Sequence, residues 1–172
     1  MGMDVMGKNP TSERGAYFRN NVWSWHPLWS YCETMHGKIA GKVKYGHSND
    51  GDGLNAEDAA KLGQALLEDI ADGTAQGYEQ DYYAHLASLP FQDCNWCGAT
   101  GIRTDDIGVS MGMPTAELPE EVAIIVGRTH GTCNGCRGAG QVESWEASYV
   151  FGVDNLREFA EFLIDCGGFE IC

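Results

Sequence analysis

Two short repeats of cysteine and glycine constrain this chain more than any other feature of its sequence. The first repeat, CNWCGATG, spans residues 94–101, and the second, CNGCRGAG, spans residues 133–140. A Cys-x-x-Cys turn directs two sulfurs at one point, and two such turns supply the four ligands of a closed tetrahedral zinc site. His130 lies just before the second repeat, but four cysteines complete the ligand set without it. The sequence therefore predicts one structural zinc ion, bound by Cys94, Cys97, Cys133 and Cys136.

The second repeat has the pattern CxxCxGxG, which resembles the repeat of the zinc region of DnaJ-type chaperones. The first repeat departs from that pattern at Ala99, where the family has glycine. The resemblance implies that the two repeats clamp one zinc ion across an arrangement like a β-hairpin. It does not imply chaperone activity, because the His-Pro-Asp triplet of the J domain is absent from the sequence. The segments YFRNNVW (17–23) and NDGDGL (49–54) resemble those of small bacterial and phage proteins that have no assigned activity.

The cysteine content favours metal binding over disulfide bonds. The chain has seven cysteines, and its N-terminal residues do not resemble a secretory signal, so a reducing cytoplasm is the simplest setting. Three cysteines remain after the zinc ligands, and an odd number cannot all pair. We expect Cys32 and Cys166 to be buried as small apolar residues, and we assign no role to Cys172. The sequence has no apolar run long enough to predict a membrane span.

The chain is strongly acidic, and its charge is unevenly distributed. The net charge is −14, of which residues 1–47 carry +3, residues 48–122 carry −13 and residues 123–172 carry −4. An acidic body repels the phosphates of nucleic acids, so direct binding to nucleic acid is not expected. The same charge suits a protein partner with a basic surface. Solubility alone is the competing explanation of the acidity.

The pattern of apolar residues predicts an α+β fold, with a helical body, a zinc hairpin of two knuckles and short antiparallel strands. Strands are predicted at residues 38–46 and 142–151, and residues 1–15 are predicted to be irregular. Helices are predicted where apolar residues recur every three to four positions, which occurs at residues 27–36, 56–71, 74–88 and 155–166. A further helix is predicted at residues 120–127, after Pro119, and a strand is the competing interpretation because β-branched residues are frequent there.

We expect a single domain of residues 1–172, since a chain of this length can bury a sizeable core. The short connection between the second and third predicted helices makes them antiparallel neighbours in a helical pair, residues 55–89. The zinc-knuckle subregion, residues 91–145, is inserted between this pair and a C-terminal strand-helix unit, residues 141–172.

The residues that are candidates for contacting a partner are aromatic and acidic. Residues 16–36 contain a block of aromatic side chains, and a core helix with further aromatic residues around it is the competing interpretation of that block. Exposed aromatic residues serve as anchors in interfaces because they bury a large area at low entropic cost. The candidate partner-binding residues are Trp23, Trp25, Trp29, Asp50, Asp52, Glu57 and Glu68.

The turn at residues 47–52 is the best candidate for a catalytic site. It contains His47, Asn49, Asp50 and Asp52, and a histidine with two carboxylates can support acid–base catalysis or metal-assisted hydrolysis. The competing interpretation is an exposed acidic turn that leads into a helix capped by Asn55.

Three functions are compatible with these features. The first is a zinc-stabilised binding or adaptor protein that acts by protein–protein interaction without chemistry of its own. The second is an acidic mimic of nucleic acid that inhibits a basic host enzyme, as some phage proteins do. The third is a small hydrolase that uses the His47–Asp52 turn. We favour the first, because the strong metal motif is coordinatively closed.

Overall fold

The structure is a computed structural model that describes residues 2–102 and 133–172. The described residues form four α-helices and short antiparallel strands, so the predicted α+β class is confirmed. The predicted helix 120–127 and the residue His130 lie outside the described residues. No helix in this part of the chain is long and apolar enough to cross a membrane.

The chain divides into two compact units. The first unit is built from residues 1–87 and 148–172, and the knuckle unit is built from residues 88–147. Each unit has an apolar core of its own. The knuckle unit contains both cysteine repeats and interrupts the sequence of the first unit.

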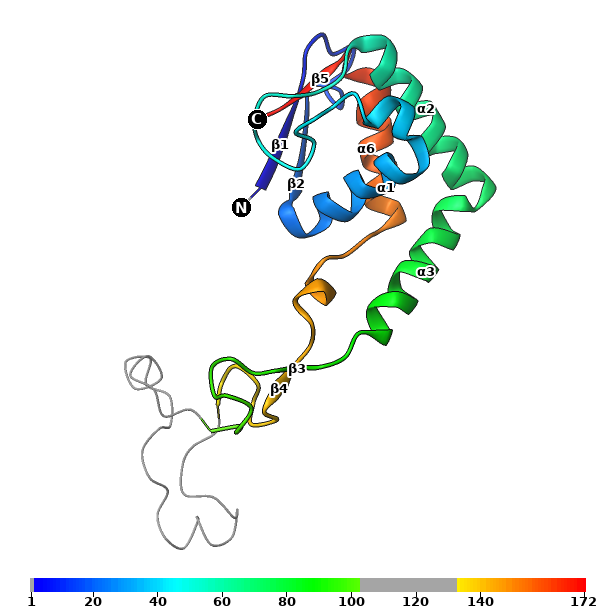
Figure 1. The fold of residues 1–172 in the computed structure, drawn as a ribbon. Coiled ribbons are helices and arrows are strands. Elements are labelled where there is room, and N and C mark those ends of the chain that lie inside the picture. The colour runs from blue at the N-terminus through cyan, green and yellow to red at the C-terminus, as the bar shows by residue number, and fades with distance from the viewer. Residues whose placement is uncertain (1, 103–132) are drawn as a thin grey trace, which may run out of the picture. The chain divides into compact units, whose positions relative to one another are not determined.

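A three-stranded antiparallel sheet forms one side of the first unit (Figure 1). Its strand order is β2 (Tyr17–Asn21), β1 (Gly2–Gly7) and β5 (Phe169–Ile171). The prediction of an irregular segment at residues 1–15 is therefore wrong for residues 2–7, whereas residues 8–15 form bends and turns as expected. Met3 and Val5 are buried and alternate with the more exposed Asp4, which is the period of a strand that buries one face.

A loop covers the edge of the sheet at β5. The Gly51 N–H donates to the carbonyl of Ile171 at 2.8 Å, and the Ile171 N–H donates to the carbonyl of Asp52 at 2.8 Å. The Phe169 N–H adds a third bond, to the carbonyl of Leu54, at 3.0 Å. Residues 51–54 thus satisfy the backbone groups that an edge strand exposes.

Helix α1 (Val22–Ala40) begins earlier than predicted and contains Pro27. Its N-cap is Asn21, whose side chain accepts the Ser24 N–H at 3.0 Å. Pro27 has no N–H to give to the carbonyl of Trp23, and the Val150 N–H donates to that carbonyl instead, at 3.0 Å. This external donor lets the helix continue through the proline. The helix is kinked at His36, which has a non-helical φ of −127°. The predicted strand 38–46 is wrong, because helical residues follow the kink up to Ala40 and turns follow them.

Helices α2 (Ala56–Asp72) and α3 (Thr74–Ser88) have almost the predicted bounds. Asn55 caps α2 by accepting the Asp58 N–H, and Gly73 ends it with a left-handed φ of 90°. The two helices are not antiparallel neighbours, however. Helix α2 packs along α6 (Val153–Asp165), whereas α3 leads away from α2 (Figure 1).

Helix α6 begins two residues before the predicted start, and a side chain of α3 caps it. Gly152 offers no side chain at the N-cap, and Glu79 Oε1 accepts the Val153 N–H at 3.1 Å. The predicted strand 142–151 is wrong beyond its first residue, because β4 (Gln141–Val142) is followed by a 3₁₀ turn at Trp145–Ser148.

The core of the first unit is rich in aromatic rings. Trp25 and Trp29 stack with their ring centroids 5.7 Å apart, and both lie edge-on to Phe159. Cys32 and Cys166 are buried in this core, as expected, while Cys172 is exposed. The fully buried large side chains are Trp25, Trp29, Tyr31, Phe151, Phe159, Phe162, Phe169, Leu28, Leu62, Leu66, Leu156 and Leu163.

Candidate metal centre

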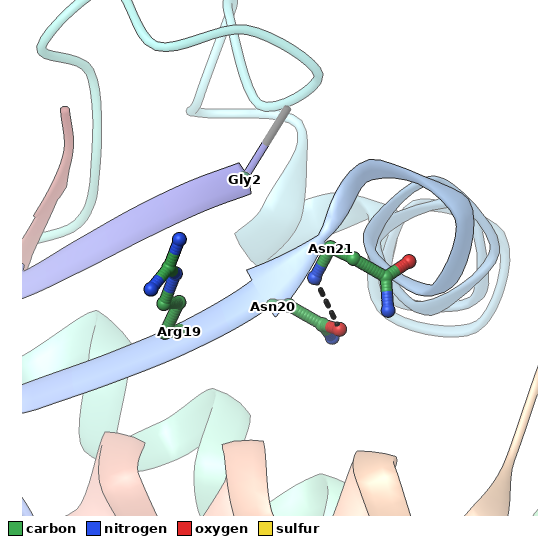
Figure 2. A pocket seen from close by; sticks show the side chains of 4 residues that line it. All are labelled: Gly2, Arg19, Asn20 and Asn21. Atoms are coloured by element: carbon green, nitrogen blue, oxygen red, sulfur yellow. Dashed lines mark hydrogen bonds between the residues drawn. The ribbon is translucent and has the colours of Figure 1, made fainter.

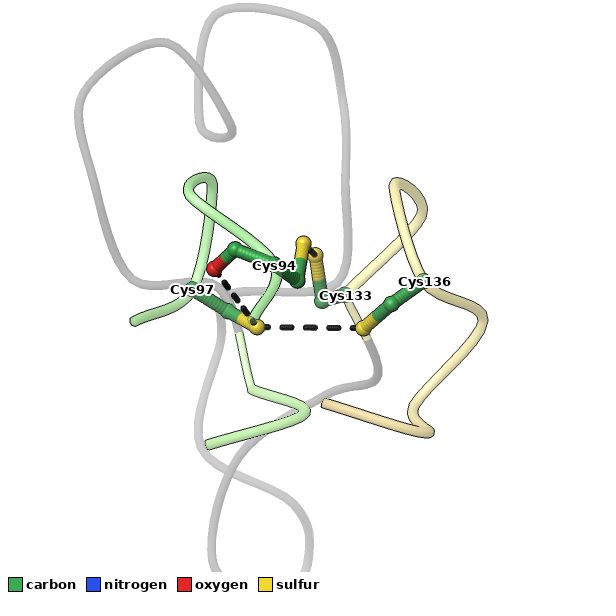
Figure 3. Close-up of side chains that lie close together, drawn as sticks. All are labelled: Cys94, Cys97, Cys133 and Cys136. Atoms are coloured by element: carbon green, nitrogen blue, oxygen red, sulfur yellow. Dashed lines mark hydrogen bonds between the residues drawn. The ribbon is translucent and has the colours of Figure 1, made fainter. Parts of the chain in front are cut away.

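Two short strands bring the cysteine repeats together in the knuckle unit. Strand β3 (Gln92–Asp93) pairs antiparallel with β4, so the chain enters the first repeat beside the point where it leaves the second. The two repeats therefore form two turns that face one another across a small space (Figure 3).

The four cysteine sulfurs lie within 4.8 Å of one another. The Sγ atoms of Cys94 and Cys133 are 3.9 Å apart, and those of Cys97 and Cys136 are 3.7 Å apart. A tetrahedral ion with metal–sulfur bonds of about 2.3 Å requires sulfur–sulfur distances of about 3.8 Å. A disulfide requires about 2.05 Å, and all four cysteines are free. The sulfurs are thus positioned to bind one metal ion.

The two knuckles are equivalent, with corresponding residues 39 positions apart. The Cys94 N–H donates to the carbonyl of Gly140 at 2.8 Å, and the Cys133 N–H donates to the carbonyl of Gly101 at 2.7 Å. Each repeat therefore begins on a hydrogen bond to the end of the other. This reciprocity fixes the two turns in register, so the sulfurs are held at the distances that a metal ion needs.

The last glycine of each repeat has no room for a side chain. Gly101 and Gly140 have left-handed φ values of 73° and 76°. A Cβ atom on Gly101 would lie 2.4 Å from the carbonyl oxygen of Gly138, and one on Gly140 would lie 2.3 Å from that of Ala99. The final glycine of the CxxCxGxG pattern is thus required by contact with the opposite knuckle.

The departure of the first repeat from the pattern has a structural cost. Ala99 adopts a φ of 65°, and Gly138, its equivalent in the second repeat, adopts 86°. A left-handed conformation costs a residue with a Cβ roughly 1–2 kcal/mol. The first knuckle therefore keeps the geometry of the second despite the alanine, at the expense of local strain.

Backbone N–H groups point at two of the sulfurs. The Gly101 N–H donates to Cys97 Sγ at 3.3 Å, and the Gly140 N–H donates to Cys136 Sγ at 3.2 Å. Burial raises the pKa of the Cys94 thiol to about 11. Burial also opposes ionisation of Cys136, but hydrogen bonds from the N–H groups of Gly140 and Gly138 and from the thiols of Cys97 and Cys133 outweigh that effect and lower its pKa. These N–H donors stabilise the thiolate form, which is the form that binds a metal.

The candidate tryptophan anchors are mostly buried. Trp25 and Trp29 have no exposed surface, so their assignment as partner-binding residues is wrong. The indole N–H of Trp25 donates to the carbonyl of Gly46 at 2.7 Å, which fixes it inside the core. Trp23 is the exposed member of the three, at 38%, and its ring contacts that of Tyr149.

The candidate acidic residues differ in their surroundings. Asp50, Glu57 and Glu68 are exposed, and Glu57 forms an ion pair with Lys61 at 2.6 Å. Asp52 instead accepts the backbone N–H groups of Lys44, Tyr45 and Gly53, at distances of 2.6, 3.1 and 2.8 Å. Burial opposes the charged form of Asp52, but these three donors hold its pKa below the usual value. Asp52 therefore stabilises the turn between Lys44 and Gly53 by accepting its backbone N–H groups.

The catalytic constellation expected at residues 47–52 is not assembled. His47 Nδ1 lies 2.8 Å from Nδ1 of His26, and His47 Nε2 lies 3.0 Å from a carboxylate oxygen of Glu33. Asp52 faces the backbone, and Asp50 accepts the Ser48 hydroxyl. Sequence reasoning missed His26 and Glu33, because they are brought to His47 only when α1 packs beside the loop that follows it.

Comparisons of the chain with protein-family models, with curated proteins and with solved structures found no significant match. The resemblance to DnaJ-type chaperones therefore stays confined to the cysteine repeats. The assignment of the metal centre depends on its geometry.

Proposed function

We propose that Cys94, Cys97, Cys133 and Cys136 bind one structural zinc ion. The arrangement of the four sulfurs at metal-binding distance carries this proposal. Four thiolates are a common ligand set of structural zinc, and they leave no coordination position for water or substrate. The ion would hold the two knuckles together and would perform no chemistry.

The core of the knuckle unit supports this role. Among the described residues, its apolar cluster consists of the four cysteines and Val142. A cluster of this size cannot offset the conformational entropy that folding removes. Binding of zinc to four thiolates contributes on the order of 10 kcal/mol to the folding of small metal domains. The zinc ion would therefore supply most of the stability of this unit.

The protein as a whole would act by binding a protein partner with a basic surface, without chemistry of its own. The net charge of −14 supports this choice of partner, because complementary charge steers association and disfavours partners of like charge. Asp50, Glu57 and Glu68 are exposed on the surface of the first unit, where a partner can reach them. The contact would draw on these carboxylates, with Trp23 as the remaining aromatic candidate.

Removal of the metal tests the zinc proposal. Treatment with a chelator should make the amides of residues 91–102 and 133–145 exchange rapidly with solvent hydrogen, while the amides of α2 and α6 stay protected. Cys97→Ser should give the same pattern, and Cys172→Ser, which removes an exposed cysteine outside the cluster, should leave both regions unchanged. Unaltered protection of the knuckle residues after chelation would contradict the proposal.

Charge reversal tests the binding proposal. A partner isolated from extracts of the source cells should bind the Glu57→Lys/Glu68→Lys variant more slowly than the wild type, and with a weaker dependence on salt. Glu143→Lys/Glu146→Lys is the matched control, because it changes the net charge equally in the knuckle unit. Equal association rates for the wild type and both variants would exclude these acidic residues from the contact. Competition by duplex DNA for the same partner would favour the alternative function, an acidic mimic of nucleic acid.

A further inference from the structure

The two edges of the sheet in the first unit differ in whether another segment bonds to them. At β5, residues 51–54 bond to the strand and cover its edge. At the other edge, no segment within residues 2–102 and 133–172 pairs with β2. An exposed strand edge presents unpaired N–H and C=O groups that can template an additional strand.

The register of the sheet identifies which backbone groups of β2 face outward. The Gly7 N–H donates to the carbonyl of Ala16 at 3.0 Å, so Gly7 and Ala16 form a hydrogen-bonded pair. Pairs alternate along an antiparallel ladder, so the backbone groups of Phe18 and Asn20 also face β1. Those of Tyr17 and Arg19 therefore point away from the sheet. The series of outward-facing backbone groups stops before Asn21, because the Asn21 N–H donates to Asn20 Oδ1 at 2.9 Å (Figure 2).

Open space lies at both ends of β2. At the start of β2, a hollow of about 220 Å³ is lined by apolar rings and by charged side chains. At the end of β2, a second pocket is lined by Gly2, Arg19, Asn20 and Asn21 (Figure 2). The residues that line the first hollow are Arg14, Tyr17, Phe18, Glu158, Glu161 and Phe162.

We propose that the outer edge of β2 receives an extended peptide of a basic partner as an additional strand. Tyr17 and Arg19 would exchange backbone hydrogen bonds with the peptide, and one of its apolar side chains would enter the hollow beside Phe18 and Phe162. This inference rests on the proposed function and names the mode of contact.

The charges near the outer edge of β2 favour binding of a basic peptide over pairing with a second copy of this chain. Glu158 and Glu161 line the hollow, and Arg14 is paired with Glu161 at 2.9 Å. Arg19 lies 3.8 Å from Asp4, which offsets its charge. A second copy would bring its own net charge of −14 to this surface, and like charges oppose such pairing. An apolar residue and a lysine or arginine two positions apart would reach the rings and the glutamates of the hollow together, because side chains at positions i and i+2 of a strand lie on the same face.

Selection from a random heptapeptide phage library provides the probe for this edge. Arg19→Pro removes the outward N–H that would donate to a carbonyl of the peptide. Proline is tolerated on an edge strand where its nitrogen faces solvent. Arg19→Val is the matched control, because it removes the same side chain and keeps that N–H. Peptides enriched on the wild type should carry an apolar residue and a Lys or Arg two positions apart. They should bind Arg19→Val at least as tightly as the wild type, because loss of a cation at the edge favours a basic peptide. They should bind Arg19→Pro at least tenfold more weakly than Arg19→Val.

Hydrogen exchange in the presence of an enriched peptide locates the contact. The amides of Tyr17 and Arg19 should become protected, and those of Phe18 and Asn20 should be protected without peptide. Absence of enrichment, equal binding to Arg19→Pro, or unchanged exchange at Tyr17 and Arg19 would each overturn the inference. So would a dimer in which these amides are protected without peptide. None of these outcomes bears on zinc binding or on the role of Glu57 and Glu68, so a failure here is distinct from a failure of the proposed function.

Discussion

At the scale of single residues, the metal centre depends on glycines that touch the opposite knuckle. Gly98 and Gly101 both have a left-handed φ, of 57° and 73°, but a Cβ on Gly98 meets nothing within 4 Å. Gly101→Ala should therefore weaken metal binding far more than Gly98→Ala, since the added methyl collides with the carbonyl of Gly138. Competition with a chromophoric chelator measures both affinities. Similar losses in the two variants would show that backbone conformation, and not the contact, makes Gly101 necessary.

The pair of His26 and His47 makes the first unit sensitive to acid. Burial, and then the proximity of His47, lower the pKa of His26 below its usual value of 6.5. Glu33 bonds to the far side of His47, and the Tyr149 ring meets His26 edge-on. Because the folded state disfavours the protonated form, the contribution of neutral His26 is complete above pH 6.5 and is lost as pH falls through the lowered pKa.

The melting temperature of the wild type should accordingly fall more steeply between about pH 7.5 and about pH 5.5 than that of His26→Asn. The asparagine offers a hydrogen-bonding group near the position of Nδ1 and does not titrate in this range. Thermal unfolding followed by tryptophan fluorescence measures the difference. Parallel pH profiles would mean that His26 titrates equally in the folded and unfolded chain. Loss of a bound metal at acid pH would affect the wild type and His26→Asn alike, and it would cancel in the comparison.

At the scale of elements, the contact between α2 and α6 depends on Gly63, a glycine within a helix that has no room for a side chain. A Cβ on Gly63 of α2 would lie 2.8 Å from the carbonyl oxygen of Ala160 and 2.9 Å from Cβ of Leu163. Gly77 of α3 has nothing within 4 Å. Gly63→Ala should lower the free energy of unfolding by about 1–3 kcal/mol, because it overpacks the helix contact. Gly77→Ala should raise it by about 0.5–1 kcal/mol, because alanine favours a helix. Urea unfolding measures both changes, and a stabilised Gly63→Ala would disprove the close packing of α2 on α6.

The elements that were predictable from the sequence are those with local signals. Helix α2 begins at the predicted cap, Asn55, and ends at a glycine, Gly73, whose φ of 90° suits the end of a helix. The elements that were not predictable depend on distant residues. Helix α1 passes through Pro27 because Val150 supplies a hydrogen bond, and β1 becomes a central strand only between β2 and β5.

In the candidate metal centre, too, some features were predictable from local sequence and others depend on distant residues. The spacing of the four cysteines was sufficient to predict their cluster, because each repeat contributes two ligands from one tight turn. The reciprocal bonds between Cys94 and Gly140 and between Cys133 and Gly101 were not predictable, because they join turns that lie far apart in the sequence. Burial of Trp25 and Trp29 likewise follows from packing against Phe159 of α6.

At the scale of the whole molecule, the two units obtain their stability from different sources. The first unit buries a large apolar core that joins helices α1, α2 and α6 to the sheet. The described part of the knuckle unit has only its cysteines and Val142 in its cluster. A bound ion would therefore act as the core of the knuckle unit, while the first unit would fold without it.

X-ray absorption at the zinc edge, on protein purified without chelator, tests this central claim most directly. The account predicts one zinc ion per chain, surrounded by four sulfurs at about 2.3 Å. Protein without zinc, or zinc bound mainly by oxygen and nitrogen, would contradict it.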